Sequence, residues 1–97
     1  MKRSINGIIG QGKVIGANAG DRPVARTGTL TMSLAVAAPI LRQQLEATDA
    51  PFVYAGPVLV GRERIQETFP VVLSSVNIDG KTVRIRFESS GEIKAMR

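Results

Sequence analysis

Between residues 28 and 37 apolar and polar side chains alternate one by one, and this alternation constrains the fold more than any other feature of the chain. Successive side chains of a β-strand point to opposite faces, so the stretch predicts a strand with one face in a core. The same alternation returns over residues 82–88, just after Asp79-Gly80, a strong hairpin signal. The alternating residues are Leu30, Met32, Leu34, Val36, Val83, Ile85 and Phe87 on the apolar side, and Thr29, Thr31, Ser33, Thr82, Arg84, Arg86 and Glu88 on the other. We therefore expect a chain that is mainly β.

Other stretches predict strands less regularly. Residues 4–17, 52–60 and 71–78 are rich in Val, Ile and Leu, and the second of these has a possible kink at Gly56-Pro57. Residues 18–27 contain Asn, Gly, Asp and Pro and predict a loop. Residues 62–69 fit a strand or an extended loop, and the tail from Ser89 predicts a turn with at most one edge segment.

One helix is expected in the middle of the chain. Pro39 suits a first helical turn, and Ile40, Leu41 and Leu45 follow at helical spacing. The helix should end near Thr48, before the turn residues Asp49 and Pro51. The predicted order is strand, strand, helix, strand, strand, strand within a single domain over residues 1–97. This order favours a small barrel or a curved antiparallel sheet capped by a helix.

The first glycines resemble a phosphate-binding loop. Gly7, Gly12 and Lys13 have the spacing of G-x-x-x-x-G-K-[ST], but Val14 stands where the hydroxyl should be. Such a loop must open a helix, and Val14-Ile15-Gly16 followed by Asn18 does not predict one. We therefore interpret Gly10 and Gly12 as residues that let a long first strand bend sharply.

Composition excludes several classes of function. The chain has no cysteine and no histidine, so a disulfide, a thiolate metal site and a Ser-His-Asp triad are impossible. The acidic residues show no metal or acid–base spacing, and we expect no enzyme, no metal and no cofactor. No apolar run reaches the ~18 residues of a membrane span, and we expect a cytoplasmic protein that does not enter membranes.

Charge points to a polyanionic partner. The chain has 13 Lys and Arg against 8 Asp and Glu, a net charge of +5 and a pI of about 10.5. A basic domain of this size is a candidate for nucleic-acid binding. A soluble surface that is basic for no specific purpose is the alternative.

Two parts of the chain carry a resemblance to a known family. The first is residues 16–36, with Asp21, Pro23 and Arg26 before Gly28-Thr29 and a final Ser33-Leu-Ala-Val36; the second is Phe52-Val53-Tyr54-Ala55-Gly56, then Leu59 and Arg62. Together they resemble bacterial single-stranded-DNA-binding proteins, although that family's third strand and stacking tryptophans have no counterpart here. The resemblance implies an OB-like barrel that binds single-stranded DNA.

These observations leave two hypotheses. The first is a single-stranded nucleic-acid-binding module, with basic side chains on phosphates and two aromatic rings for base stacking. The second is a non-enzymatic structural or assembly protein, virion- or plasmid-encoded, that self-associates; a protein-binding inhibitor is its variant. In both cases we expect a homo-oligomer formed through strand edges. The candidate phosphate contacts are Lys13, Arg22, Arg26, Arg62, Arg64, Arg84 and Arg86, and the candidate stacking residues are Phe52 and Tyr54.

Overall fold

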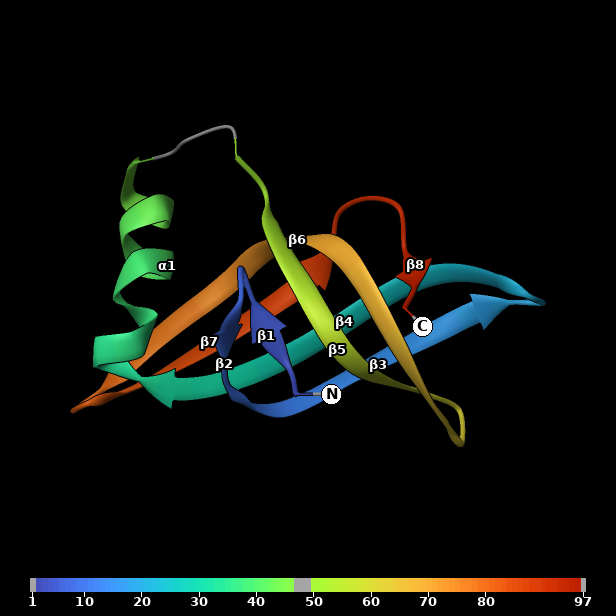
Figure 1. Ribbon diagram of the computed structural model, residues 1–97, viewed down its shortest axis with the longest axis horizontal. Helices are drawn as coiled ribbons and strands as arrows, with labels where there is room; N and C mark the ends of the chain where they lie inside the picture. Colours follow the sequence, from blue (N-terminus) through green and yellow to red (C-terminus); the bar gives the residue numbers. More distant parts are fainter. Residues whose placement is uncertain (1, 47–49, 97) are drawn as a thin grey trace.

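The computed structural model describes residues 2–46 and 50–96 and shows a strongly curved sheet with one helix at its end (Figure 1). The elements in chain order are β1 (Ser4–Ile5), β2 (Ile8–Ile9), β3 (Gln11–Ala19), β4 (Arg22–Ser33), α1 (Leu34–Glu46), β5 (Phe52–Val60), β6 (Glu63–Asp79), β7 (Thr82–Ser89) and β8 (Lys94–Ala95). The prediction of a mainly β chain with one helix is confirmed. The predicted helix end near Thr48 lies outside the described residues.

Five strands form a closed ring in the order β3-β4-β7-β6-β5 and back to β3. Four of the five contacts are antiparallel ladders. The fifth, between β3 and β5, is parallel and short, with Ile15 opposite Leu59 and Gly16 opposite Val60. The β1–β2 hairpin pairs with β5 outside the ring, and β8 pairs with β6. The expectation of a curved sheet capped by a helix, with an OB-like ring of strands, is confirmed.

The core fills the inside of this ring. The alternation in β7 is confirmed, because Val83, Ile85 and Phe87 are all fully buried. Tyr54 lies between two other rings, with its centroid 5.1 Å from that of Phe69 and 5.5 Å from that of Phe87. Offset aromatic pairs at these separations stabilise a core beyond the area they bury.

The glycine-rich start forms strands, as we interpreted it, and no helix follows it. Asn6 and Gly7 make the two-residue turn of the β1–β2 hairpin, with φ values of 53° and 80°. Two positive φ angles define a type I′ turn, for which Asn-Gly is the preferred sequence. Gly12, opposite Leu30, lies where β3 runs very close to β4: a Cβ atom there would be 1.8 Å from the Thr29 carbonyl oxygen.

The predicted loop at residues 18–27 is wrong. β4 already begins at Arg22, and only Gly20-Asp21 connects it to β3. The pairing of the two strands, which local composition does not reveal, extends them into a long hairpin arm. The predicted strands at 52–60, 71–78 and 82–88 are confirmed, and residues 63–69 are strand. The Asp79-Gly80 hairpin is also confirmed, with Gly80-Lys81 as its turn.

The helix begins five residues earlier than Pro39. β4 ends at Ser33, opposite Thr82 at the start of β7, so no partner strand remains to continue the ladder. The Ser33 hydroxyl accepts a hydrogen bond from the Val36 N–H at 3.4 Å and caps the new helix. Leu34 and Val36 are therefore helical, although their alternation predicted strand. None of the helices in the described part of the chain has the length and apolarity to cross a membrane.

Candidate nucleic-acid interface

The outer face of β3, β4 and β7 brings three of the predicted basic residues together. Because alternate residues of a strand point outward, the register places Lys13, Thr29 and Arg86 in one row across the three strands. Thr31 and Arg84 lie in the next row. Neighbouring strands are about 4.8 Å apart, so a row across three strands spans about 10 Å of backbone. We call Lys13, Arg84 and Arg86, with Thr27, Thr29 and Thr31, the basic face.

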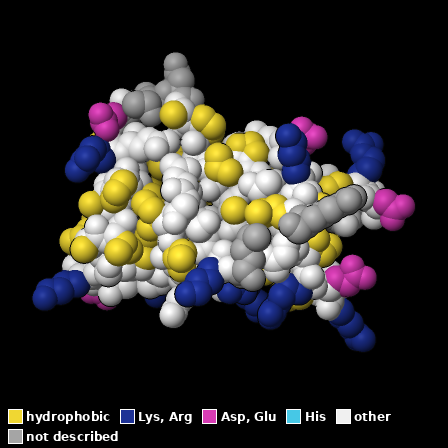
Figure 2. All heavy atoms as spheres, in the orientation of Figure 1, with side chains coloured by type: hydrophobic (Ala, Val, Ile, Leu, Met, Phe, Trp, Pro, Cys, Tyr) yellow, Lys and Arg dark blue, Asp and Glu magenta, His cyan; other side chains and the backbone are white. Residues whose placement is uncertain are grey.

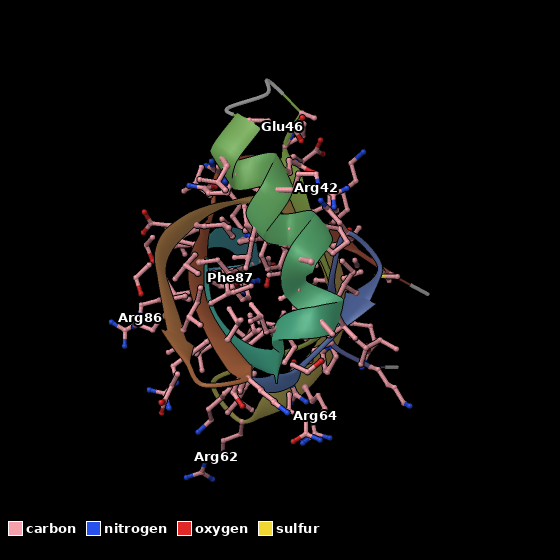
Figure 3. The ribbon with its side chains drawn as sticks, turned by 90° about the vertical axis from the view of Figure 1, so that its left-hand side faces the viewer. Arg42, Glu46, Arg62, Arg64, Arg86 and Phe87 are labelled. Atoms are coloured by element: carbon pink, nitrogen blue, oxygen red, sulfur yellow. The ribbon has the colours of Figure 1, made fainter. Side chains whose placement is uncertain are left out.

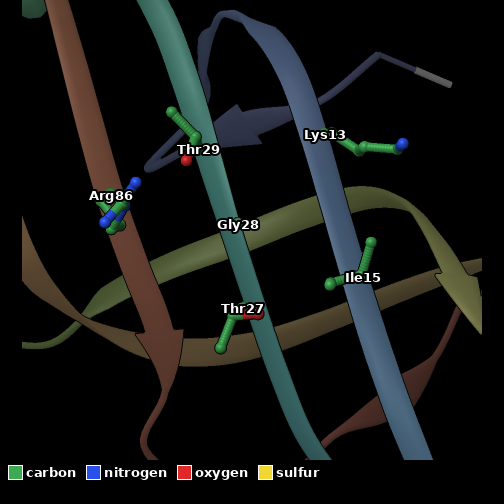
Figure 4. A pocket seen from close by; sticks show the side chains of 6 residues that line it. All are labelled: Lys13, Ile15, Thr27, Gly28, Thr29 and Arg86. Atoms are coloured by element: carbon green, nitrogen blue, oxygen red, sulfur yellow. The ribbon is translucent and has the colours of Figure 1, made fainter.

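A shallow hollow of about 330 Å³ lies in the middle of the basic face (Figure 4). Lys13 and Ile15 border it on β3 and Arg86 borders it on β7. Between them, the hydroxyls of Thr27 and Thr29 stand on either side of Gly28, on β4. An ammonium group, a guanidinium group and two hydroxyls around one depression can all donate hydrogen bonds to an oxyanion.

A second hollow of about 390 Å³ continues the face toward the β6–β7 hairpin. Thr31 and Arg84 border it together with Asn77, Thr82 and one carboxylate, Asp79. The two hollows lie side by side along β4 and β7, because Thr29 and Thr31 alternate on one strand and Arg86 and Arg84 on the other. The polar groups therefore form a continuous strip rather than one isolated site.

The basic face carries more positive than negative charge: Lys13, Arg84 and Arg86 share it with two carboxylates, Asp79 at the second hollow and Glu88 opposite Thr27. The one ion pair found among residues 2–46 and 50–96 joins Arg26 to Glu67, inside the barrel. Lys13, Arg84 and Arg86 are exposed and have no ion-pair partner there. Figure 2 shows several Lys and Arg side chains along the lower edge of the molecule, and Asp and Glu side chains near both of its ends. Such unpaired surface charge is available to phosphate groups.

Arg26 is not a phosphate contact, and that prediction is wrong. Its side chain is fully buried and makes a two-pronged ion pair with Glu67, with Nε at 2.6 Å from Oε1 and Nη2 at 3.0 Å from Oε2. Nη1 donates to the carbonyls of Ala17 and Ala25, and Nη2 donates to Asn18 Oδ1. All five N–H groups of the guanidinium thus have partners. Gly16 leaves the room for it, since a Cβ there would be 2.4 Å from Arg26 Cδ.

The other predicted arginines are exposed but lie away from Arg84 and Arg86. Arg22 begins β4 at the tip of the β3–β4 arm, and Arg62 is in the turn between β5 and β6. Arg64 is near the start of β6, in the part that pairs with β5 opposite Leu59, whereas β6 pairs with β7 only from Val71 onward. In Figure 3 Arg62 and Arg64 lie together at one end of the barrel, apart from Arg86.

The predicted base-stacking residues lie in the core. Tyr54 is fully buried and Phe52 is 8 % exposed. Phe69 and Phe87 are also buried, so the surface offers no aromatic ring to a base. The stacking prediction is therefore wrong, because the apolar interior of a barrel this small takes all four aromatic side chains. One exposed apolar side chain, that of Ile15, is half exposed and borders the first hollow.

The burial of Tyr54 predicts a loss of stability at alkaline pH. Its hydroxyl donates to the Pro57 carbonyl at 2.6 Å, and burial raises the pKa of Tyr54 from 10.0 to about 12. Between these values the unfolded chain loses a proton that the folded chain retains, so stability falls as pH rises. Across this pH window we expect the free energy of unfolding of the parent protein to fall by about 2 to 3 kcal/mol more than that of the Tyr54→Phe variant. Urea unfolding of both proteins measures it, and since Tyr54 is the only tyrosine, its absorbance gives the pKa directly. Parallel pH curves for the two proteins would contradict the prediction.

The threonines and Ile15 were not among the predicted site residues. The alternation of residues 28–37 already placed Thr29 and Thr31 on the polar side of a strand, so that signal could have found them. Thr27 and Ile15 had no such signal, because their positions depend on the β3–β4 register. No protein-family model, no curated protein and no solved structure matches this chain.

Proposed function

We propose that this protein binds single-stranded nucleic acid, DNA in the first instance, by holding its phosphates on the basic face. The observation that carries the proposal is the register that places Lys13, Thr29 and Arg86 in one row, with Arg84 and Thr31 in the next. Lysine and arginine supply the charge, and the threonine hydroxyls supply hydrogen bonds to phosphate oxygens. The net charge of +5 adds a favourable long-range field.

The shape of the basic face favours a single strand over a duplex. The face is part of a curved barrel, and its two hollows follow β4 and β7 side by side. A flexible strand can bend to follow this curve, whereas a straight duplex would touch it over a shorter distance. Because all four aromatic rings are buried, base stacking, worth about 1–3 kcal/mol per base in such proteins, adds nothing here. Binding should then be driven by phosphates and tolerate most sequences.

The salt dependence gives a quantitative prediction. Each phosphate contact on a single strand contributes about −0.7 to the slope of log K against log salt. Three cations on the basic face therefore predict a slope of about −2. Fluorescence anisotropy of a labelled oligonucleotide of ~30 nucleotides, titrated with protein at several salt concentrations, measures this slope.

A charge-matched pair of variants tests where the strand binds. Replacing Lys13, Arg84 and Arg86 together by glutamine should reduce the slope to near zero and abolish most of the binding. Replacing Arg22, Arg42 and Arg62 by glutamine removes the same charge from exposed positions outside the basic face. This variant should retain most of the binding. Equal losses in both triple variants would contradict the assigned face. No binding by the unaltered protein even at low salt would overturn the proposed function and favour the self-associating assembly protein.

A further inference from the structure

A second basic hollow lies outside the basic face, where the N-terminal segment meets the start of β3. It has a volume of about 510 Å³, and its lining includes two cations and no carboxylate. The described residues that line it are Lys2, Arg3, Ile9, Gly10, Gln11 and Gly12. The backbone of Arg3 is held in place from both sides, since its carbonyl accepts the Gly10 N–H at 3.1 Å and its Cα packs against Gly56.

Within the described residues the guanidinium of Arg3, unlike that of Arg26, forms no ion pair, and its Nε has no acceptor. Its Nε is buried from solvent and makes no hydrogen bond within the described chain, whereas every N–H of Arg26 is satisfied. A buried donor on a charged group without an acceptor is costly, and native structures generally supply an acceptor. The group that completes this site should therefore carry oxygen acceptors and negative charge.

The exposed edge of β3 adds backbone donors to the same hollow. β3 pairs with β4 along its length but meets β5 only at Ile15 and Gly16. Over residues 11–14 the edge of β3 that faces away from β4 has no strand partner among the described residues. In an antiparallel strand alternate N–H groups point to opposite edges, so part of this stretch directs its donors toward the hollow. Gly12 and Gln11, which line it, belong to this stretch.

We propose that this hollow binds a phosphate group. Arg3 supplies the planar donor fork that matches two phosphate oxygens, Lys2 supplies a second positive charge, and the β3 edge supplies N–H groups. The site is not a phosphate-binding loop, because Gly7 to Lys13 form a hairpin turn, β2 and the start of β3 rather than the start of a helix. It uses none of the side chains of the basic face, so it can hold phosphate whether or not a strand binds there.

The test is a titration of the whole protein with inorganic phosphate at constant ionic strength, with chloride as the balancing ion. In an NMR spectrum of the arginine Nε–H groups, the Arg3 signal should shift and saturate, while that of exposed Arg62 should barely move. Arg3→Lys keeps the charge but loses the fork, and should weaken phosphate binding about tenfold with an unchanged amide spectrum. Equal, unsaturated shifts at Arg3 and Arg62 would overturn the proposal, as would an Arg3→Lys variant that binds phosphate as well as the parent.

A second arm identifies the source of the phosphate. Two short oligonucleotides, one with a terminal phosphate and one with a terminal hydroxyl, are added to the variant lacking Lys13, Arg84 and Arg86. If only the phosphorylated strand shifts the Arg3 signal, the site takes the end of a nucleic acid. If neither strand does so while inorganic phosphate still does, the ligand is a free phosphate or a small phosphate ester. Both results are read at Arg3 in a variant without the cations of the basic face. The phosphate site can therefore be tested even if no strand binds the basic face.

Discussion

Replacing Arg26 by methionine is expected to lower the free energy of unfolding by about 3 to 5 kcal/mol. The substitution keeps most of the buried aliphatic stem but leaves the Glu67 carboxylate, 4 % exposed, without its partner. It also removes the hydrogen bonds to the carbonyls of Ala17 and Ala25 and to Asn18, which lie within the β3–β4 arm. Urea unfolding gives the change in stability.

Two further variants show whether the loss comes from the ion pair. Arg22→Met, on the same strand but exposed, should change stability by no more than about 0.5 kcal/mol. The double variant Arg26→Met with Glu67→Leu should recover most of the loss, because it removes the buried carboxylate together with its partner. A loss below about 1 kcal/mol in Arg26→Met, or no recovery in the double variant, would contradict this account of the pair.

Gly12→Ala is expected to destabilise the barrel by about 3 kcal/mol or more. The added Cβ would stand 1.8 Å from the Thr29 carbonyl oxygen and 2.9 Å from its carbon, and both are backbone atoms of β4. To relieve this clash, β3 and β4 must move apart. The same part of their ladder places Lys13 opposite Thr29. Thermal and urea unfolding measure the loss, and oligonucleotide anisotropy below the melting temperature shows whether the basic face is distorted too.

Gly10→Ala is the matched control for Gly12→Ala. A Cβ at Gly10 would have its three closest neighbours at 3.1 to 3.2 Å, and the nearest is the flexible end of Met32. This variant should lose less than about 1 kcal/mol, because a shift of a few tenths of an ångström suffices. Similar effects of the two substitutions would show that the close approach of β3 and β4 at Gly12 does not constrain the strands.

The candidate site was partly predictable, and the residues that were missed share one cause. Arg84 and Arg86 alternate with buried residues on one strand, so their exposure follows from local sequence. Local sequence does not show that Arg84 and Arg86 share a face with Lys13. That placement depends on the β3–β4 and β4–β7 registers. Arg22 and Arg26 look alike in sequence, yet one is exposed and the other buried. The difference is Glu67, 41 residues away from Arg26.

What the sequence alone determined is local: β5 at residues 52–60, the hairpin before β7, the alternation of β7 and the presence of one helix. These features depend on periodicity and turn chemistry over a few residues, which act before any tertiary contact forms. Only the tertiary structure decided that β4 begins at Arg22 and ends at Ser33, that β3 closes the ring against β5, and that all four aromatic rings point inward. Each depends on which distant segment supplies the partner, and burial in a ring this narrow leaves no aromatic side chain on the outer face of β3, β4 and β7.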